Sequence, residues 1–176
     1  MKKIILGLLV VLCSIIGLAR VLKNVDIEQN CFGYLELAAF ASTPQIALTQ
    51  MQKATKYLEK NNLTKGYTSI LYQTPDEDIS FWYTNLKESE AELKKVTDQT
   101  SALEKSNLLM KLRETLLDRS GSDTILKTPH GLVAFPNNKL WGLAILIVCI
   151  TFIGLIISVF MHLDRIPVYD NYFKFK

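Results

Sequence analysis

The sequence predicts an all-α fold, a membrane-anchored antiparallel bundle of about four helices flanked by two transmembrane helices. Two observations lead to this prediction. Two long uncharged apolar segments lie near the two ends of the chain, and the section between them is much more polar. That middle section carries apolar residues at helical spacing, together with Thr-Pro pairs and capping boxes that are typical of helix starts.

The first apolar segment, Ile4–Ala19, has 16 residues without a charge and follows Lys2 and Lys3. This pattern fits an N-terminal signal anchor over residues 1–22, and it also fits a signal peptide that is cleaved after Ala19. We favour the uncleaved anchor, because the residues that follow Ala19 continue the helical pattern and no polar stretch precedes the candidate cleavage site.

The second apolar segment covers residues 140–163 and has 24 residues without Asp, Glu, Lys or Arg. As a helix it would rise roughly 36 Å, which exceeds a hydrocarbon core of about 30 Å. Gly154 and Ser158 are four residues apart and predict a small-residue face on which another helix could pack in the membrane. The lipid bilayer is therefore the first expected partner.

Charge predicts the orientation. Between Arg20 and Lys139 the chain has 15 basic and 15 acidic residues, so the net charge of +3 comes from the two ends. A neutral middle section excludes the broad basic surface that nucleic acid requires. Positive flanks at both ends predict cytoplasmic termini, including a short tail over 164–176, with residues 23–139 extracytoplasmic, as in a bacterial inner-membrane protein.

The helical bundle is predicted over residues 23–119 and has four helices. The first ends near Ala41, the second runs from Pro44 to Asn61, the third begins at Pro75, and the fourth runs from Ala102 to Arg119. The third of these shows the clearest stripe: Ile79, Trp82, Leu86, Leu93 and Val96. Its outer face is predicted to carry Glu88, Glu90 and Glu92, with Glu90 and Lys94 forming a favourable pair four residues apart. Residues 63–73 are too apolar for a free loop and are expected to pack across the bundle, whereas residues 120–139 predict an extended linker.

No residues predict catalysis, a metal site or a cofactor. The acidic cluster Asp76-Glu77-Asp78 suggests either a weak calcium site or, more simply, carboxylates that complement the start of a helix. Cys31 is the one cysteine outside the apolar segments, so it either cross-links two chains or is a buried free thiol. The sequence lacks the common phosphate-binding, serine-hydrolase and zinc-protease motifs.

Phe81, Trp82 and Tyr83 form the densest aromatic cluster, and three consecutive helical residues cannot all face one core. Trp82 fits the inward stripe, so Phe81 or Tyr83 must lie outside the core. That side chain is either covered by residues 63–73 or forms a surface that binds a ligand or a partner. We therefore expect a non-enzymatic integral membrane protein whose extracytoplasmic bundle binds another protein or a second copy, as an accessory or scaffold subunit. The alternative is an extracytoplasmic small-molecule sensor that acts through a separate partner.

Overall fold

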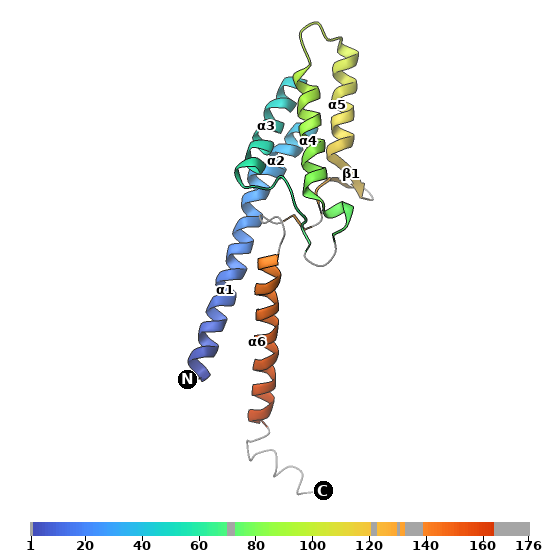
Figure 1. Cartoon of the computed structure of the whole chain (residues 1–176). Coiled ribbons are helices and arrows are strands. Elements are labelled where there is room, and N and C mark those ends of the chain that lie inside the picture. Colours follow the sequence, from blue (N-terminus) through green and yellow to red (C-terminus); the bar gives the residue numbers. More distant parts are fainter. Residues whose placement is uncertain (1, 70–72, 121–122, 130, 133–138, 164–176) are drawn as a thin grey trace. The chain divides into compact units, whose positions relative to one another are not determined.

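The computed structural model describes residues 2–69, 73–120, 123–129, 131–132 and 139–163. The chain divides into two units, Leu18–Asn138 on the one hand and Met1–Gly17 with Lys139–Lys176 on the other. The described residues are predominantly helical, which confirms the predicted all-α class (Figure 1). In the second of these units, helix α6 spans Lys139–Leu163.

One continuous helical segment leads into the bundle. Helix α1 (Lys2–Ile27) continues through a π-helical turn, η1 (Glu28–Phe32), into α2 (Gly33–Ala39). The buried residues Ile27, Cys31 and Leu35 are each four apart. Because an α-helix turns about 100° per residue, two steps of four would rotate Leu35 away from Ile27 by about 80°. The wider π-helical turn absorbs this rotation and keeps the residues on one face.

The other bundle helices begin at strong caps. Helix α3 (Pro44–Lys60) starts after Thr43, whose side chain accepts a hydrogen bond from the Ile46 amide, and α5 (Ala102–Leu116) starts at a capping box made by Ser101 and Glu104. Helix α4 (Ile79–Lys94) starts four residues later than Pro75. Pro75–Glu77 forms a short 3₁₀ turn, η2, instead, because the Asp78 carboxylate caps the amides of Ser80 and Phe81.

Helices α2, α3, α4 and α5 form the bundle and alternate in direction along the chain (Figure 1). Helix α2 packs against α3 and α5, α3 packs against α4, and α4 packs against α5. Arg113 of α5 connects the first and last helices, since its Nε donates to the Ala39 carbonyl at 3.2 Å and its guanidinium lies over the Phe40 ring. The largest fully buried core side chains include Ile27, Leu35, Met51, Leu58, Leu63, Ile79, Leu86, Leu93 and Leu116.

The chain after α3 packs onto the start of α4, as its apolar residues predicted. Leu63 is fully buried, the Thr68 amide donates to the Glu77 carbonyl, and the Ile79 amide donates to the Gly66 carbonyl. Residues 70–72 of this segment lie outside the described residues.

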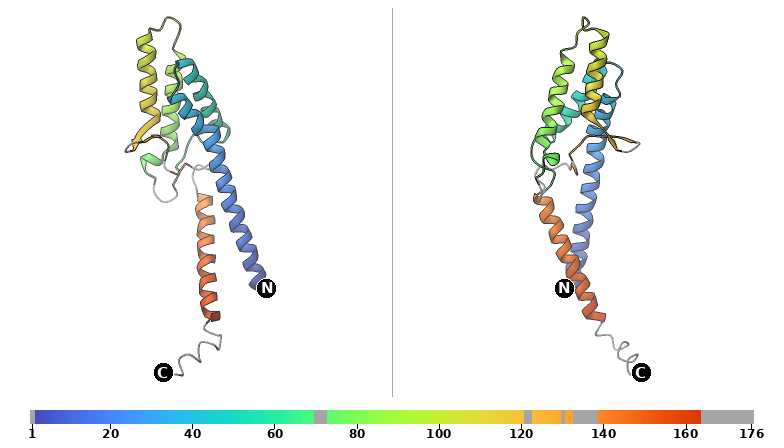
Figure 2. Two further views of the ribbon diagram at one scale, coloured as in Figure 1. Left: turned by 180° about the vertical axis from the view of Figure 1, so that it is seen from behind. Right: turned by 90° about the vertical axis from the view of Figure 1, so that its right-hand side faces the viewer.

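The segment after α5 differs from the prediction. Residues 117–120 were expected to end a helix or open an extended linker, but β1 (Leu117–Ser120) pairs antiparallel with β2 (Asp123–Leu126). Figure 2 shows this hairpin following the lower end of α5. Leu117 is buried and pairs with the half-buried Leu126, and packing of this pair onto the core favours the hairpin.

The prediction of two transmembrane helices is corrected by the structure. None of its helices, over the residues described, is both long enough and apolar enough to cross a bilayer. The uncharged part of α1 rises only about 24 Å, and Arg20, Lys23 and Asp26 follow it within the same helix. The two-pass localisation, with cytoplasmic termini and an extracytoplasmic section 23–139, is therefore withdrawn.

Candidate interaction groove

The three consecutive aromatic residues of α4 have three different environments. Phe81 is 65% exposed, whereas Trp82 is only 9% exposed and belongs to the core. Tyr83 is half-buried, packs against the core, and donates a hydrogen bond from its hydroxyl to Glu59 Oε1 at 2.6 Å. The structure thus assigns Trp82 and Tyr83 to the bundle and leaves Phe81 on the surface.

Trp82 also connects α4 to the chain beyond the hairpin. Its indole Nε1 donates to the Lys127 carbonyl at 2.9 Å, between residues 45 positions apart in sequence. The Lys127 amide in turn donates to the Leu116 carbonyl at 2.7 Å. These two hydrogen bonds hold the Lys127 backbone between Leu116, at the end of α5, and Trp82 of α4.

A groove of about 570 Å³ lies between α4 and the hairpin. Phe81, Trp82 and Leu86 contribute to its α4 side, while Asp118 and Ile125 contribute to its hairpin side. Asp118 and Ile125 are cross-strand partners, so their side chains share one face of the hairpin. The full lining consists of Pro75, Asp76, Asp78, Phe81, Trp82, Asn85, Leu86, Thr115, Asp118, Ile125, Leu126, Lys127, Thr128 and Pro129.

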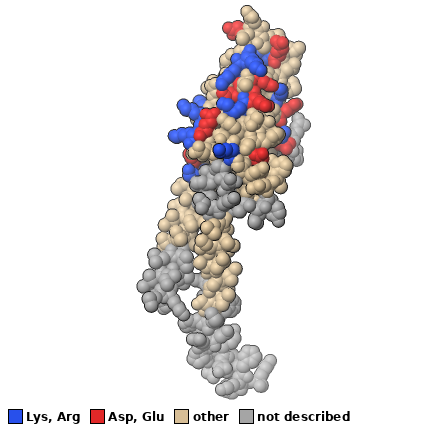
Figure 3. Space-filling view, in the orientation of Figure 1, with Lys and Arg blue, Asp and Glu red and all other residues tan. Residues whose placement is uncertain are grey.

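The groove carries more negative than positive charge. Its lining has three carboxylates, from Asp76, Asp78 and Asp118, and one ammonium, from Lys127. The Lys127 ammonium donates to the Glu114 carbonyl near the C-terminus of α5, at 3.0 Å, where the helix dipole also favours a cation. This local excess of acid contrasts with the face of the bundle shown in Figure 3, on which basic and acidic side chains are interspersed.

No family model, curated protein or solved structure matches this chain.

The site that the sequence analysis missed is a buried carboxylate. Glu90 was expected on the outer face of its helix, yet it is 3% exposed and lies against α3. Thr55 Oγ1 donates to Glu90 Oε2 at 3.0 Å, and the ammonium groups of Lys87 and Lys94 lie 3.1 and 2.6 Å from the Glu90 oxygens. The predicted pair of Glu90 with Lys94 is therefore confirmed, but it stands at a helix interface. The signal was the spacing, since Glu90 is four residues after Leu86 and three before Leu93.

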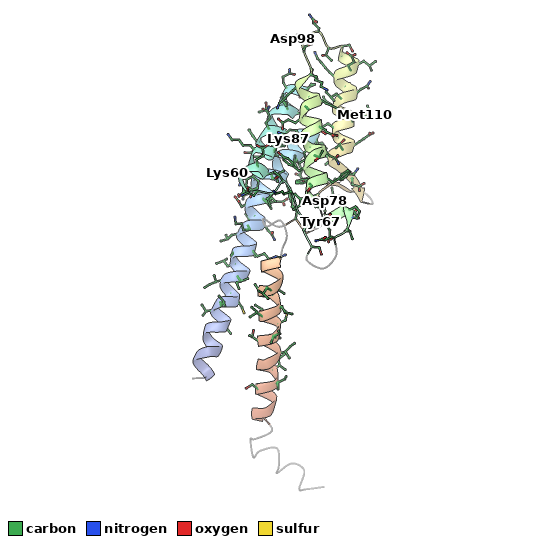
Figure 4. The ribbon with its side chains drawn as sticks, viewed as in Figure 1. Lys60, Tyr67, Asp78, Lys87, Asp98 and Met110 are labelled. Carbon is green, nitrogen blue, oxygen red and sulfur yellow. The ribbon has the colours of Figure 1, made fainter. Side chains whose placement is uncertain are left out.

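The network extends to a second carboxylate at the surface. Lys87 also lies 3.3 Å from Glu59 Oε1, the same oxygen that Tyr83 contacts (Lys87 is labelled in Figure 4). The hydrogen bond from Tyr83 lowers the pKa of Glu59, and Lys87 adds to the effect. Burial raises the pKa of Tyr83 to about 12, and the bond to Glu59 contributes to this rise. Glu59 of α3 thus contacts Tyr83 and Lys87 of α4, and these contacts connect the two helices.

Electrostatics stabilise the ionised form of Glu90. Burial raises the pKa of Glu90, but the hydrogen bonds from Lys94, Lys87 and Thr55 together outweigh burial, so the net pKa lies below its usual value. A carboxylate held by two cations and a hydroxyl is a stabilising contact between helices. Both of its oxygens have partners, Lys94 at Oε1 and Lys87 with Thr55 at Oε2.

The remaining predicted candidates are placed as follows. Cys31 is fully buried, and burial raises its pKa to about 12, with Glu28 adding to the rise. This burial favours the interpretation of Cys31 as a free thiol over its interpretation as a cross-link between two chains. Asp78 caps α4, and among the described residues no group of three His, Cys, Asp or Glu side chains is arranged to hold a metal.

Gly154 and Ser158 are both exposed on α6. Apart from its two chain neighbours and the backbone of its own helix, no atom of the described residues lies within 4 Å of the position that a Cβ on Gly154 would occupy. The role of this pair in packing against another helix stays a prediction.

Replacing Glu90 by Gln should destabilise the bundle. The variant keeps the side-chain shape but leaves two lysines without their shared counter-ion, so we expect the free energy of unfolding to fall by about 1–3 kcal/mol. The loss should be smaller than for a fully buried pair because Lys87 and Lys94 are 40% and 52% exposed. Urea denaturation of the full chain measures it. Glu88→Gln on the exposed face of α4 is the matched control and should change stability by less than about 0.5 kcal/mol.

The same carboxylate should make stability depend on pH. Because the native pKa of Glu90 lies below its unfolded value, its contribution is complete above about pH 5 and is lost as the pH falls through the native pKa. Wild-type protein should therefore lose more stability than Glu90→Gln between about pH 5 and pH 3. Equal losses in the two proteins would contradict this assignment.

Substitutions of Tyr83 and Phe81 should separate the two aromatic environments. Tyr83→Phe removes the hydrogen bond to Glu59 and should lower the free energy of unfolding by about 1 kcal/mol. Phe81→Gln changes a mostly exposed side chain and should stay within about 0.5 kcal/mol of the wild type. Urea denaturation compares the two variants, and a larger loss in Phe81→Gln would show that Phe81 belongs to the core.

Proposed function

We propose that this chain is a non-enzymatic protein-interaction module, an accessory or scaffold subunit whose helical bundle binds another protein through the groove between α4 and the β1–β2 hairpin. The observation that carries this proposal is Phe81, a large apolar side chain that is 65% exposed at the edge of a concave surface. Ile125, on the opposite element, is 51% exposed. Exposed apolar side chains gathered around a groove are typical of interaction sites.

The energy available at this groove is sufficient for a binding hot spot. Covering the exposed part of an aromatic side chain such as Phe81 is worth about 2–3 kcal/mol. Large side chains that a partner buries completely are the usual hot spots of protein interfaces. The Trp82–Lys127 hydrogen bond supports a preformed groove, which lowers the ordering cost on binding.

The ionisable groups between α3 and α4 support interaction over catalysis. Glu90, Lys87 and Glu59 are paired with one another and with neighbouring side chains across α3 and α4. Such pairing stabilises the platform on which the groove is built.

A small-molecule sensor is the second candidate, and one observation favours it. The groove volume, about 570 Å³, falls within the range of about 300–1,000 Å³ that small-molecule sites occupy. A sensor of this kind would act through a separate partner.

A photo-crosslinking amino acid at position 81 tests the two candidates. We expect illumination of the full chain in its own cells to give a discrete adduct whose added mass is that of a polypeptide, because a bound protein would cover Phe81. The same amino acid at Lys56, an exposed position on α3, is the control and should give no such adduct. Gel electrophoresis and mass spectrometry of the adducts make the measurement.

A small-molecule sensor predicts a different result. Position 81 would then give no polypeptide adduct, and the purified chain would show a ligand-dependent rise in melting temperature that Phe81→Gln abolishes. This combination would contradict the proposed protein-binding function.

A further inference from the structure

We infer that two copies of this chain associate through β2, whose outer edge pairs antiparallel with the same edge of the second copy about Ile125. The two hairpins then form one four-stranded sheet. This inference goes beyond the proposed function, which depends on Phe81 and the groove, because it concerns the backbone edge of the hairpin. An exposed strand edge presents a row of amides and carbonyls on which another strand can pair.

The edge of β2 that faces away from β1 has backbone groups without partners. The Lys127 amide donates to the Leu116 carbonyl, so Ile125, two residues earlier, is the next residue to exchange hydrogen bonds with β1. Thr124 and Leu126 occupy the alternate positions, and their amides and carbonyls therefore point away from β1. Within the described part of the chain the sheet has two strands, and no residue there bonds to these outward groups.

This edge is also open to another chain. Figure 2 shows the hairpin extending away from the lower end of α5. Thr124 is exposed, and Ile125 is 51% exposed. The edge of β1 differs, because the Leu117 amide donates to the Arg113 carbonyl at the end of α5. Of the two strands, β2 therefore offers the pairing edge.

The sequence of β2 is complementary to itself in one register. When Ile125 lies opposite Ile125 of the second copy, Thr124 lies opposite Leu126 at both ends, and the outward amides and carbonyls of both strands are paired. The two isoleucines then meet at a non-hydrogen-bonded position, where opposed side chains are closest. Asp123 of each copy takes the register position opposite Lys127 of the other, so opposite charges face each other at both ends.

The neighbouring registers are less favourable, and this selects the register about Ile125. A shift by two residues would place Ile125 opposite Asp123 or Lys127, an apolar residue against a charge. The Lys127 ammonium donates to the neutral Glu114 carbonyl and so retains its charge for the second copy. A twofold contact of this kind uses the same surface on both copies. It is much smaller than the roughly 800 Å² per partner of a standard interface, so we expect a weak dimer with a Kd of about 10–100 μM.

Disulfide trapping tests the register. Residues opposed at a non-hydrogen-bonded position have Cα atoms about 4.5 Å apart, which suits a disulfide, whereas diagonal neighbours are about 7–8 Å apart. In the full chain, with Cys13 and Cys149 replaced by Ser, we expect Ile125→Cys to form a disulfide dimer about tenfold or more faster than Thr124→Cys. Cys31 is buried and is left in place. Non-reducing gel electrophoresis measures the rates.

Sedimentation equilibrium of the full chain tests the backbone pairing. Thr124→Pro removes an outward amide and leaves the hydrogen bonds between β1 and β2, so we expect it to weaken the dimer by about tenfold or more. Thr124→Ala keeps the amide and is the matched control, with a Kd within about twofold of the wild type. Phe81→Gln changes the groove and should leave the dimer intact.

An exchange of charges tests the two ends of the contact. Asp123→Lys alone or Lys127→Glu alone puts like charges opposite each other and should weaken the dimer by about three- to tenfold. A mixture of the two variants should associate again, because opposite charges then meet at both ends. The hydrogen bonds of Lys127 to Leu116 and Trp82 use its backbone and remain in the variant. Unchanged melting temperatures exclude unfolding as the cause.

Three outcomes would overturn the inference. Equal rates of disulfide formation in Ile125→Cys and Thr124→Cys would contradict the register. A dimer that Thr124→Pro does not weaken would place self-association on another surface. A chain that stays monomeric at about 1 mM, well above the expected Kd, would contradict self-association altogether. Each of these outcomes leaves the proposed function standing, since cross-linking at position 81 to another protein tests that function separately.

Discussion

The hydrogen bond from the Trp82 indole to the Lys127 carbonyl is the constraint on which the candidate site depends. It fixes an otherwise irregular segment against α4 and so sets the separation between the helix and the β1–β2 hairpin. An isolated two-stranded hairpin is marginally stable in water. Here Leu117 buries its side chain in the core, while the residue after the hairpin is bonded to both α5 and α4. The groove is therefore a product of tertiary packing.

Two faces of helix α4 have different neighbours. One face meets α3 through Tyr83, Lys87 and Glu90, whose contacts form a continuous polar network beside the apolar core. The neighbouring face meets the groove through Phe81. Because consecutive helical residues are about 100° apart, a run of three aromatic residues supplies a surface anchor, a core residue and an interhelical hydrogen bond at adjacent positions.

Local signals predicted much of the bundle, because they act over a few residues. The signals at Thr43 and Ser101 placed the starts of α3 and α5, and the apolar stripe from Ile79 placed α4, although the predicted start at Pro75 became a 3₁₀ turn. The burial of Glu90 was missed because burial depends on which helix faces it, although its position on the stripe gave a signal. The hairpin was missed since its pairing depends on the core beneath Leu117, and the polar residues of β1 carry no clear strand pattern. Sequence also showed that the aromatic triplet must split, but only the packing of α3 decided that Phe81 is the exposed member.

Hydrogen exchange at the hairpin and at Lys127 measures the central constraint most directly. In the full chain we expect the amides of Ile125 and Lys127 to be protected, and Trp82→Phe to speed their exchange by about tenfold, as loss of one hydrogen bond predicts. Amides within α3 should exchange at the same rate in both proteins. Unchanged exchange at Ile125 and Lys127 in Trp82→Phe would show that the groove wall does not depend on this bond and would contradict the account.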